Sequence, residues 1–251
     1  MREFKAGEGA GTKYIHALVG GRVNSGKTHF AATAPRPLFI SDMAEGGFVT
    51  LDHMNPALWW DPACKPEVWA GESMMDYPKA ITKLIEMAAK GGGKLKWDTL
   101  VFDSLSIYAQ RVLREIKAGN PGGDGRARYG DLADALSLMV ARVHTLPMHI
   151  IWLCHINDEM QLAVSGKATH AIWAYMDYKW LCSVDTTGKT NDYQLRTVPF
   201  RGADWLGGRS DMFSQFDPII PSFKCVAEIL GLPAQPVSPA LPGYPDGASY
   251  K

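Results

Sequence analysis

The sequence predicts an α/β fold, in which a mainly parallel sheet is flanked by helices and carries an antiparallel β-hairpin towards its C-terminal end. Up to residue 154, short apolar runs alternate with helix-like segments, the order typical of parallel strands joined by right-handed crossovers. Beyond that point, two β-forming runs flank the polar segment 185–192, which is typical of a hairpin turn. We therefore expect one domain over residues 1–231 and a flexible Pro-rich tail over 232–251.

The predicted strands are apolar runs that end at glycine or at polar side chains, and they cover 14–19, 37–41, 99–103, 148–154, 172–184 and 193–200. The predicted helices have apolar residues at helical spacing and end near glycine or proline, and they cover 27–34, 77–90, 104–118, 131–146 and 222–230. Segments 42–78 and 119–129 lack both patterns. We expect a Trp-rich, acidic loop with short helical pieces in the first, and a mobile basic loop in the second.

Charge excludes two classes of protein. The chain has 251 residues with 26 Lys+Arg and 26 Asp+Glu, so it is neither a generally basic DNA coat nor an acidic mimic of nucleic acid. The charges are unevenly placed, since residues 1–40 hold six basic and two acidic residues, 41–80 hold two and seven, and 81–130 hold nine and five. The zero balance is therefore a sum of separate surfaces, and it leaves room for a local basic patch.

Cysteine usage and hydropathy predict the compartment. The four cysteines, at 64, 154, 182 and 225, form no CxxC pair, so no zinc or redox motif is visible. Unpaired cysteines fit a reducing cytoplasm. No apolar run approaches the roughly 20 residues that span a membrane, so we expect no membrane partner.

The segment Gly21–Thr28 (GRVNSGKT) matches the phosphate-binding motif GxxxxGK[ST], with a predicted strand before it and a predicted helix after it. Glycines let backbone N–H groups turn towards phosphates, and the helix N-terminus adds its dipole. Lys27 would contact the β- and γ-phosphates, and the Thr28 hydroxyl would bind Mg²⁺. We expect ATP to contact this loop and the start of the helix, at Gly21, Asn24, Ser25, Gly26, Lys27, Thr28 and His29.

A second acid is needed beside Thr28 to complete a Mg²⁺ site. Asp103 ends the predicted strand 99–103, and the carboxyl ends of parallel strands meet at one edge of a sheet. Asp103 is therefore the predicted metal ligand. The alternative is that Asp103 caps the next helix, a role that Ser104 would also fill.

ATP hydrolysis also needs a base that activates water. Many P-loop ATPases have Glu directly after the metal-binding Asp, but here that position is Ser104. The exit of the second strand offers Glu45 and, as an alternative, Asp42; either would otherwise be a solvated loop acid. At the exit of the fourth strand, His155 is a candidate sensor of the γ-phosphate, with an ordinary turn residue as the alternative.

Several basic and aromatic residues are candidates for contacts with partners. Arg126 and Arg128, next to Tyr129, combine charge and an aromatic ring as single-strand DNA binders do, unless they belong to a plain mobile loop. Trp59 and Trp60 would either stack on a base or anchor a packed loop. Candidates for an arginine finger acting on a neighbouring subunit, each otherwise a surface charge, are Lys189, Arg196, Arg201 and Arg209, of which Arg201 and Arg209 are preferred.

The run from Gly26-Lys27-Thr28 through the segment ATAPRPLFI (residues 32–40) resembles phage nucleotide-binding proteins, including the RecA-like single-strand annealing ATPases of the Sak group. Glu45-Gly46-Gly47, Asp103-Ser104, Tyr129-Gly130, His155 and Gly208-Arg209 are also similar to that family, over roughly residues 14–210. One departure is that the family has Asp-x-Glu-Gly at the second strand exit, whereas two residues separate Asp42 from Glu45 here.

The resemblance implies a RecA-like P-loop NTPase core that uses ATP and Mg²⁺. It also implies action on single-stranded DNA in phage recombination or replication, self-association into rings or filaments, a phage or host single-strand binding protein as a further partner, and the host cytoplasm as the location. Two other functions remain open at this point. One is a nucleotide-gated assembly or packaging factor with slow turnover, and the other is a P-loop nucleotide kinase.

Overall fold

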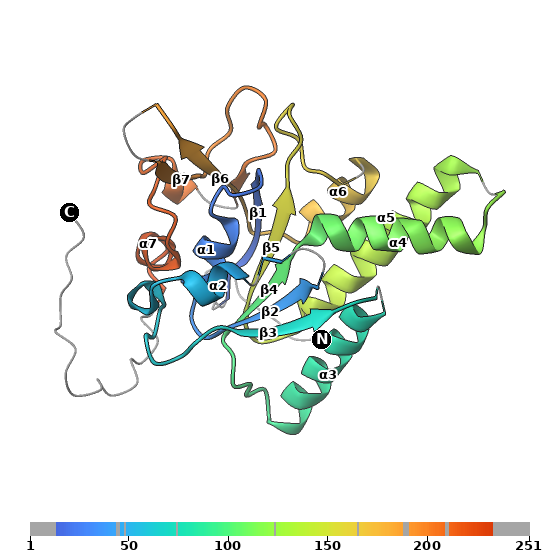
Figure 1. The fold of residues 1–251 in the computed structure, drawn as a ribbon, viewed down its shortest axis with the longest axis horizontal. Coiled ribbons are helices and arrows are strands. Elements are labelled where there is room, and N and C mark those ends of the chain that lie inside the picture. The colour runs from blue at the N-terminus through green and yellow to red at the C-terminus, as the bar shows by residue number, and fades with distance from the viewer. Residues whose placement is uncertain are drawn as a thin grey trace, which may run out of the picture.

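The computed structural model describes residues 14–43, 46–47, 49–73, 75–122, 124–164, 166–187, 191–208 and 211–232. Their strands form one sheet in the order β3-β2-β4-β5-β1-β6-β7, with β8 also paired to β6 (Figure 1). The bounds are β1 His16–Gly21, β2 Pro37–Asp42, β3 Glu67–Gly71, β4 Thr99–Asp103, β5 His149–His155, β6 Tyr178–Asp185, β7 Asp192–Arg196 and β8 Gly207–Gly208. All pairs are parallel except β6 with β7 and β6 with β8, so the predicted fold class is confirmed.

Helices cover both faces of the sheet (Figure 1). On one face pack α3 Asp76–Lys90, α4 Leu105–Gly119, α5 Gly125–Val143 and α6 Gly166–Trp173. On the other pack α1 Lys27–Ala32, α2 Val49–His53 and α7 Phe223–Ile229. Two short 3₁₀ helices, Pro56–Leu58 and Asp211–Phe213, complete the described elements. The helices near 27–34, 77–90, 104–118 and 222–230 therefore form as the sequence predicts.

The central strands are apolar on both faces because side chains alternate across a buried parallel sheet. Leu18, Phe102 and Trp152 face the α3–α6 layer, and the Phe102 and Trp152 rings stack with centroids 4.0 Å apart. Their neighbours Val19 and Val101 face the layer of α1 and α7. This double burial explains why the sequence shows continuous apolar runs and not an alternating pattern.

Three predictions of local structure were wrong in part. The segment 42–78 contains β3 at the sheet edge, beside β2, as well as α2 and a 3₁₀ turn. The interval 172–184 begins as the end of α6 and becomes a strand only at Tyr178. Within 119–129, α5 already starts at Gly125, where the Asp124 carboxylate accepts a hydrogen bond from the Arg126 N–H at 3.0 Å. Capping and edge pairing thus order residues whose composition alone indicates loops.

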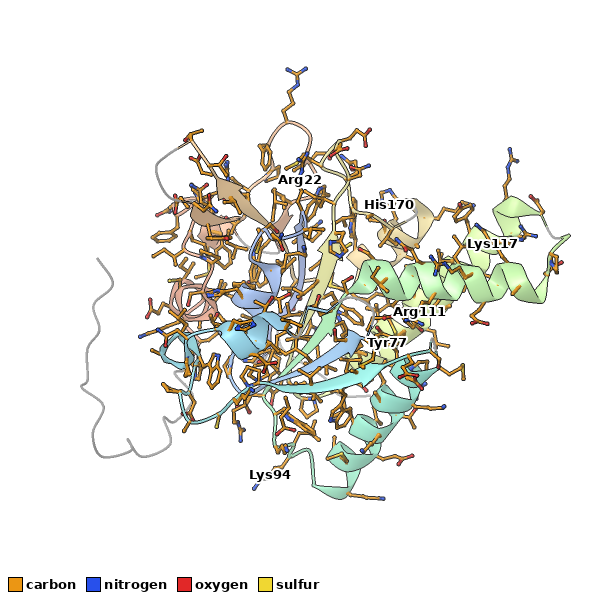
Figure 2. All side chains as sticks on the ribbon, in the orientation of Figure 1. Arg22, Tyr77, Lys94, Arg111, Lys117 and His170 are labelled. Atoms are coloured by element: carbon orange, nitrogen blue, oxygen red, sulfur yellow. The ribbon has the colours of Figure 1, made fainter. Side chains whose placement is uncertain are left out.

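The helices α4 and α5 extend beyond the sheet as a hairpin, with Lys117 on the protruding part (Figures 1 and 2). Arg128 closes this hairpin, because its guanidinium donates to the carbonyls of Asn120 at 2.6 Å and Pro121 at 2.7 Å. Within the described residues, no helix is both long enough and apolar enough to cross a membrane. Of the predicted tail, residues 233–251 lie outside the described part of the chain.

Candidate functional site

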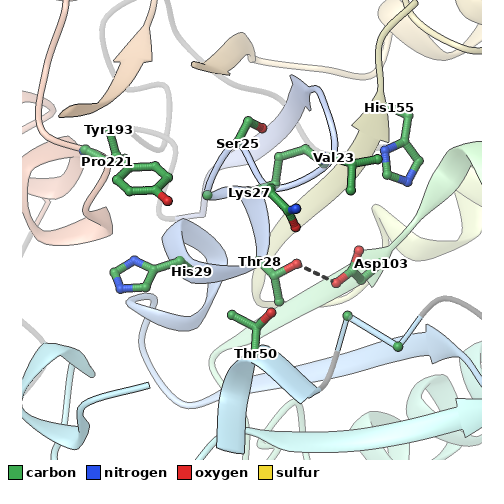
Figure 3. A pocket seen from close by; sticks show the side chains of 14 residues that line it. Val23, Ser25, Lys27, Thr28, His29, Thr50, Asp103, His155, Tyr193 and Pro221 are labelled. Carbon is green, nitrogen blue, oxygen red and sulfur yellow. Dashed lines mark hydrogen bonds between the residues drawn. The ribbon is translucent and has the colours of Figure 1, made fainter. Parts of the chain in front are cut away.

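A cavity of about 520 Å³ opens at the carboxyl ends of the central strands (Figure 3). This is the edge at which open α/β sheets bind their ligands. The cavity is lined by the predicted phosphate loop, by the exits of β4 and β5, and by residues from distant parts of the chain: Val23, Asn24, Ser25, Gly26, Lys27, Thr28, His29, Gly46, Gly47, Thr50, Asp103, His155, Tyr193 and Pro221.

The phosphate loop connects β1, which ends at Gly21, to α1, which begins at Lys27. Asn24 (φ 61°) and Gly26 (φ 89°) have left-handed backbone conformations. Such conformations turn successive N–H groups to one side and form an anion-binding concavity. The strand, loop and helix thus follow one another in the order that the motif predicts.

Lys27 is held inside this loop. Its side chain is buried, and its ammonium donates to the carbonyls of Gly21 at 2.9 Å and Arg22 at 2.8 Å. The positive charge is therefore fixed at the turn around which phosphates would bind.

Thr28 and Asp103 meet across the cavity floor. The Thr28 hydroxyl donates to Asp103 Oδ2 at 2.9 Å, and Asp103 lies buried at the end of β4 (Figure 3). A hydroxyl and a carboxylate are the oxygen ligands that Mg²⁺ accepts, usually together with phosphate oxygens and water. Both groups line the cavity beside the phosphate loop, so the residues present fit an Mg²⁺–nucleotide complex.

Gly47 lies against the same carboxylate. A Cβ atom at Gly47 would be 2.6 Å from Asp103 Oδ2, a distance that no real side chain tolerates. The chain that leaves β2 therefore passes directly over Asp103. Glu45, the predicted base, lies outside the described residues, but Gly46 and Gly47 after it line the cavity.

Asp42, the alternative base, is paired with a partly buried arginine. Its carboxylate is fully buried and contacts Arg111 of α4, whose Nη2 donates to Oδ1 at 2.6 Å. Arg111 also donates to the Glu72 carbonyl, and in Figure 2 it lies near Tyr77, between α4 and the sheet. Asp42 is absent from the described residues that line the cavity. The pair thus joins the exit of β2 to α4.

His155, the predicted sensor, ends β5 and lines the cavity. Its backbone N–H donates to the Ser106 hydroxyl at 2.8 Å, which ties this strand exit to the first turn of α4. The imidazole thus lies at the cavity end that also holds Asp103 (Figure 3).

Burial shifts the pKa of two further side chains around the phosphate loop. It lowers the pKa of His29, so this imidazole is neutral at pH 7. It raises the pKa of Cys182 to about 12. The Cys182 thiol behind the loop is therefore protonated and inert, as a structural cysteine is.

The other predicted residues do not line the cavity within the described part of the chain. Arg126 is exposed at the tip of the α4–α5 hairpin, Arg128 closes its turn, and Arg201 is exposed in a turn after β7. Arg196 pairs with Asp217 at 3.0 Å. Lys189 and Arg209 lie outside the described residues.

The Trp-rich segment packs against the layer of α1 and α7. Trp59 and Trp60 are both partly buried there, and the Trp60 ring lies 6.1 Å from Phe223 of α7. This placement fits the reading of Trp59 and Trp60 as anchors of a packed loop.

Sequence reasoning missed Val23, Thr50, Tyr193 and Pro221, which line the cavity. Tyr193 is the clearest case. It arrives through the β6–β7 hairpin, and β6 lies next to β1. The hairpin signal was visible in the sequence, but the pairing of its first strand with the phosphate-loop strand was not.

Comparison with known proteins gives one family. The family model described as "AAA domain" matches residues 13–179. No curated protein matches the sequence. Among solved structures, a KaiC-like protein from the hyperthermophilic archaeon Pyrococcus horikoshii OT3 is 11% identical, with 72% of this chain and 77% of that chain covered and a TM-score of 0.46.

Proposed function

We propose that this chain, which belongs to the AAA domain family, is a P-loop ATPase that hydrolyses ATP with Mg²⁺. In this proposal, which for the DNA part rests on the sequence resemblance to Sak-type proteins, hydrolysis is coupled to single-stranded DNA in phage recombination or replication. One observation supports the ATPase part most strongly. The phosphate loop, the Thr28 hydroxyl and the Asp103 carboxylate converge on one cavity, with Thr28 and Asp103 2.9 Å apart.

In this proposal, the backbone N–H groups of the loop bind the phosphates of ATP, and Lys27 contacts the β- and γ-phosphates. Thr28 and Asp103 would hold Mg²⁺, which would supply positive charge to neutralise the phosphate oxygens. His155, at the same end of the cavity, contacts the γ-phosphate and distinguishes ATP from ADP. The hydrogen bond from the His155 N–H to the Ser106 hydroxyl connects this residue to α4.

Glu45 serves as the base. It takes a proton from a water molecule whose oxygen attacks the γ-phosphorus, while the bond from that phosphorus to the β–γ bridging oxygen breaks and ADP leaves. Two observations favour Glu45 over Asp42. Asp42 is committed to Arg111, and the chain just after Glu45 passes over Asp103.

The exposed tip of the α4–α5 hairpin is the proposed DNA contact. Arg126 is exposed there, whereas Arg128 is occupied by two backbone carbonyls, so Arg126 is the stronger candidate of the two. The sequence resemblance to Sak-type proteins supports single-stranded DNA, self-association into a ring or filament, and a single-strand binding protein as partners. In such an assembly, Arg201 and Arg209 are candidates for reaching a neighbouring subunit's site.

ATP hydrolysis measured with and without single-stranded DNA tests the proposal, in the wild type, in Lys27→Ala and in the exposed-lysine control Lys90→Ala. We expect turnover that DNA stimulates, that Lys27→Ala abolishes and that Lys90→Ala keeps. Binding without turnover under all conditions would instead favour the assembly factor. Transfer of phosphate to a nucleoside monophosphate would favour the kinase.

Glu45→Gln extends the same experiment. We expect retained ATP binding with turnover reduced about 100-fold to 10,000-fold, because the variant keeps the side-chain shape and loses the proton acceptor. Unchanged turnover would exclude Glu45 as the base.

A further inference from the structure

We infer that Tyr193, together with Pro221 and His29, forms a platform on which the nucleobase stacks, and that this platform accepts adenine and guanine with little discrimination. The inference rests on the proposed function, since it requires that the cavity binds a nucleoside triphosphate. It adds the position of the base and the chemical basis of its selection.

The cavity has two chemically distinct ends (Figure 3). Lys27, Thr28 and Asp103 define where phosphates and Mg²⁺ would bind, and His155 lies at that end. Tyr193, Pro221 and His29 lie at the other end. A nucleotide whose β- and γ-phosphates occupy the first end therefore directs its base towards the second.

The Tyr193 ring is placed for stacking. It lies against the phosphate loop, because a Cβ atom at Gly26 would be 3.0 Å from Tyr193 Cδ1. Even so, 43% of the Tyr193 surface is exposed. An aromatic ring that is fixed at a binding loop and still open to solvent provides a flat apolar surface for a base.

The backbone holds Tyr193 and Pro221 in fixed relation. Tyr193 pairs with Val184 within the β6–β7 hairpin. Two residues further along β7, Leu195 exchanges backbone hydrogen bonds of 2.9 and 3.0 Å with Ile219. Pro221 follows Ile219 by two residues, so both sides of the platform are attached to one edge of the sheet.

Polar side chains are few at this end of the cavity, among the residues that the structure describes. Among the described residues that line the cavity there, only the His29 imidazole and the Tyr193 hydroxyl offer polar side-chain atoms. The imidazole of His29 and the hydroxyl of Tyr193 are both groups that can donate or accept a hydrogen bond, which suits the edge of either purine. Strong discrimination requires several buried hydrogen bonds to the ligand, whereas stacking tolerates any base. ATP and GTP should therefore bind within about tenfold of each other.

Equilibrium binding of ATP, GTP and inorganic tripolyphosphate tests the inference, in the presence of Mg²⁺, with wild type, Tyr193→Ala, Tyr193→Phe and Lys27→Ala. Tyr193→Ala should weaken ATP binding by about tenfold, because one base stack is lost. Tripolyphosphate binding should be unchanged in Tyr193→Ala, since this probe has no base. Tyr193→Phe should restore ATP binding, whereas Lys27→Ala should weaken all three ligands.

Each other result contradicts the inference in a distinct way. Unchanged ATP binding in a folded Tyr193→Ala variant would exclude the platform. Equal loss of ATP and tripolyphosphate binding would make Tyr193 a support of the phosphate loop. A preference between ATP and GTP above about 100-fold would exclude selection by stacking alone. Wild type that binds none of the three ligands would overturn the proposed ATPase and, with it, this inference.

Discussion

Within the part of the chain that the structure describes, polar side chains gather at both edges of the sheet, and the cavity with the candidate site lies at the carboxyl edge. At the carboxyl edge, Thr28 and Asp103 bond to each other beside an open cavity. At the amino edge, His149 accepts a hydrogen bond from the Ile15 N–H at 3.0 Å, and Asp177 accepts one from the His16 N–H at 3.2 Å. The latter groups satisfy backbone donors, which is a structural role. Burial and polarity alone therefore do not identify a functional site. What identifies it is that the polar side chains line an open cavity, where a ligand can replace their present hydrogen bonds.

The largest expected effect is a difference in ATP turnover between substitutions at two threonines, Thr28 at the start of α1 and Thr33 at its end. Thr28→Val removes the hydroxyl beside Asp103 and should reduce ATP turnover by roughly 100-fold to 1,000-fold. Thr33→Val is the matched control, because the buried Thr33 hydroxyl donates to the Phe30 carbonyl at 2.7 Å and accepts from the Phe223 N–H at 2.8 Å. It should lower the free energy of unfolding by about 1–3 kcal/mol and keep turnover. Steady-state kinetics measure ATP turnover, and denaturant titrations measure the free energy of unfolding. Similar losses of turnover in Thr28→Val and Thr33→Val would contradict the assigned roles.

Asp42 sharpens the comparison, because it lies at the carboxyl edge but outside the cavity. Asp42→Asn weakens charged hydrogen bonds to the partly buried Arg111 and should lower the free energy of unfolding by about 2–3 kcal/mol, while the folded protein keeps its turnover. Asp52→Asn is the control, since the exposed Asp52–Lys65 pair should contribute at most about 1 kcal/mol. If Asp42→Asn loses turnover at unchanged stability, Asp42 is the base.

The amino edge should respond to pH and not to nucleotide. Burial lowers the pKa of His149 to about 4, with Asp98 opposing and His16 reinforcing the shift. Between that value and the ordinary pKa near 6.5, the unfolded chain binds the additional proton, so stability falls as pH falls through this window. From pH 7 to 4.5, this histidine should reduce the free energy of unfolding by about 2–3 kcal/mol.

His149→Asn provides the control for that titration, because it offers an acceptor near the Nδ1 position and does not titrate. Chemical denaturation at several pH values should show a shallower acid dependence in the variant. Identical pH profiles for the two proteins would assign the acid sensitivity to other groups.

The phosphate end of the cavity could be predicted from the sequence because it is encoded locally. Eight consecutive residues, Gly21–Thr28, fix both the chemistry and the turn, and Asp103 follows from the rule that strand ends share an edge. The strands of the core were predictable for a similar reason, since buried parallel strands are apolar throughout. Whether Glu45 is the base stays a prediction.

The cavity end with Tyr193 and Pro221 and the α4–α5 hairpin could not be predicted in the same way. Tyr193 and Pro221 reach the cavity only because β6 pairs with β1 and Ile219 pairs with β7, and neither pairing leaves a local signal. Composition predicted a mobile loop at Arg126 and Arg128. The capping contact of Asp124 and the two carbonyl contacts of Arg128 instead order the turn and extend α5 into it.

The first half of α4 is attached to three strand exits at the carboxyl edge of the sheet. Its first residue follows Asp103 by two positions, its Ser106 accepts from the His155 N–H, and its Arg111 holds Asp42. The helix has 15 residues, which correspond to a length of roughly 22 Å. In mechanical terms, α4 is a rigid connection between the carboxyl edge of the sheet and the α4–α5 hairpin, which holds Arg126 at its exposed tip.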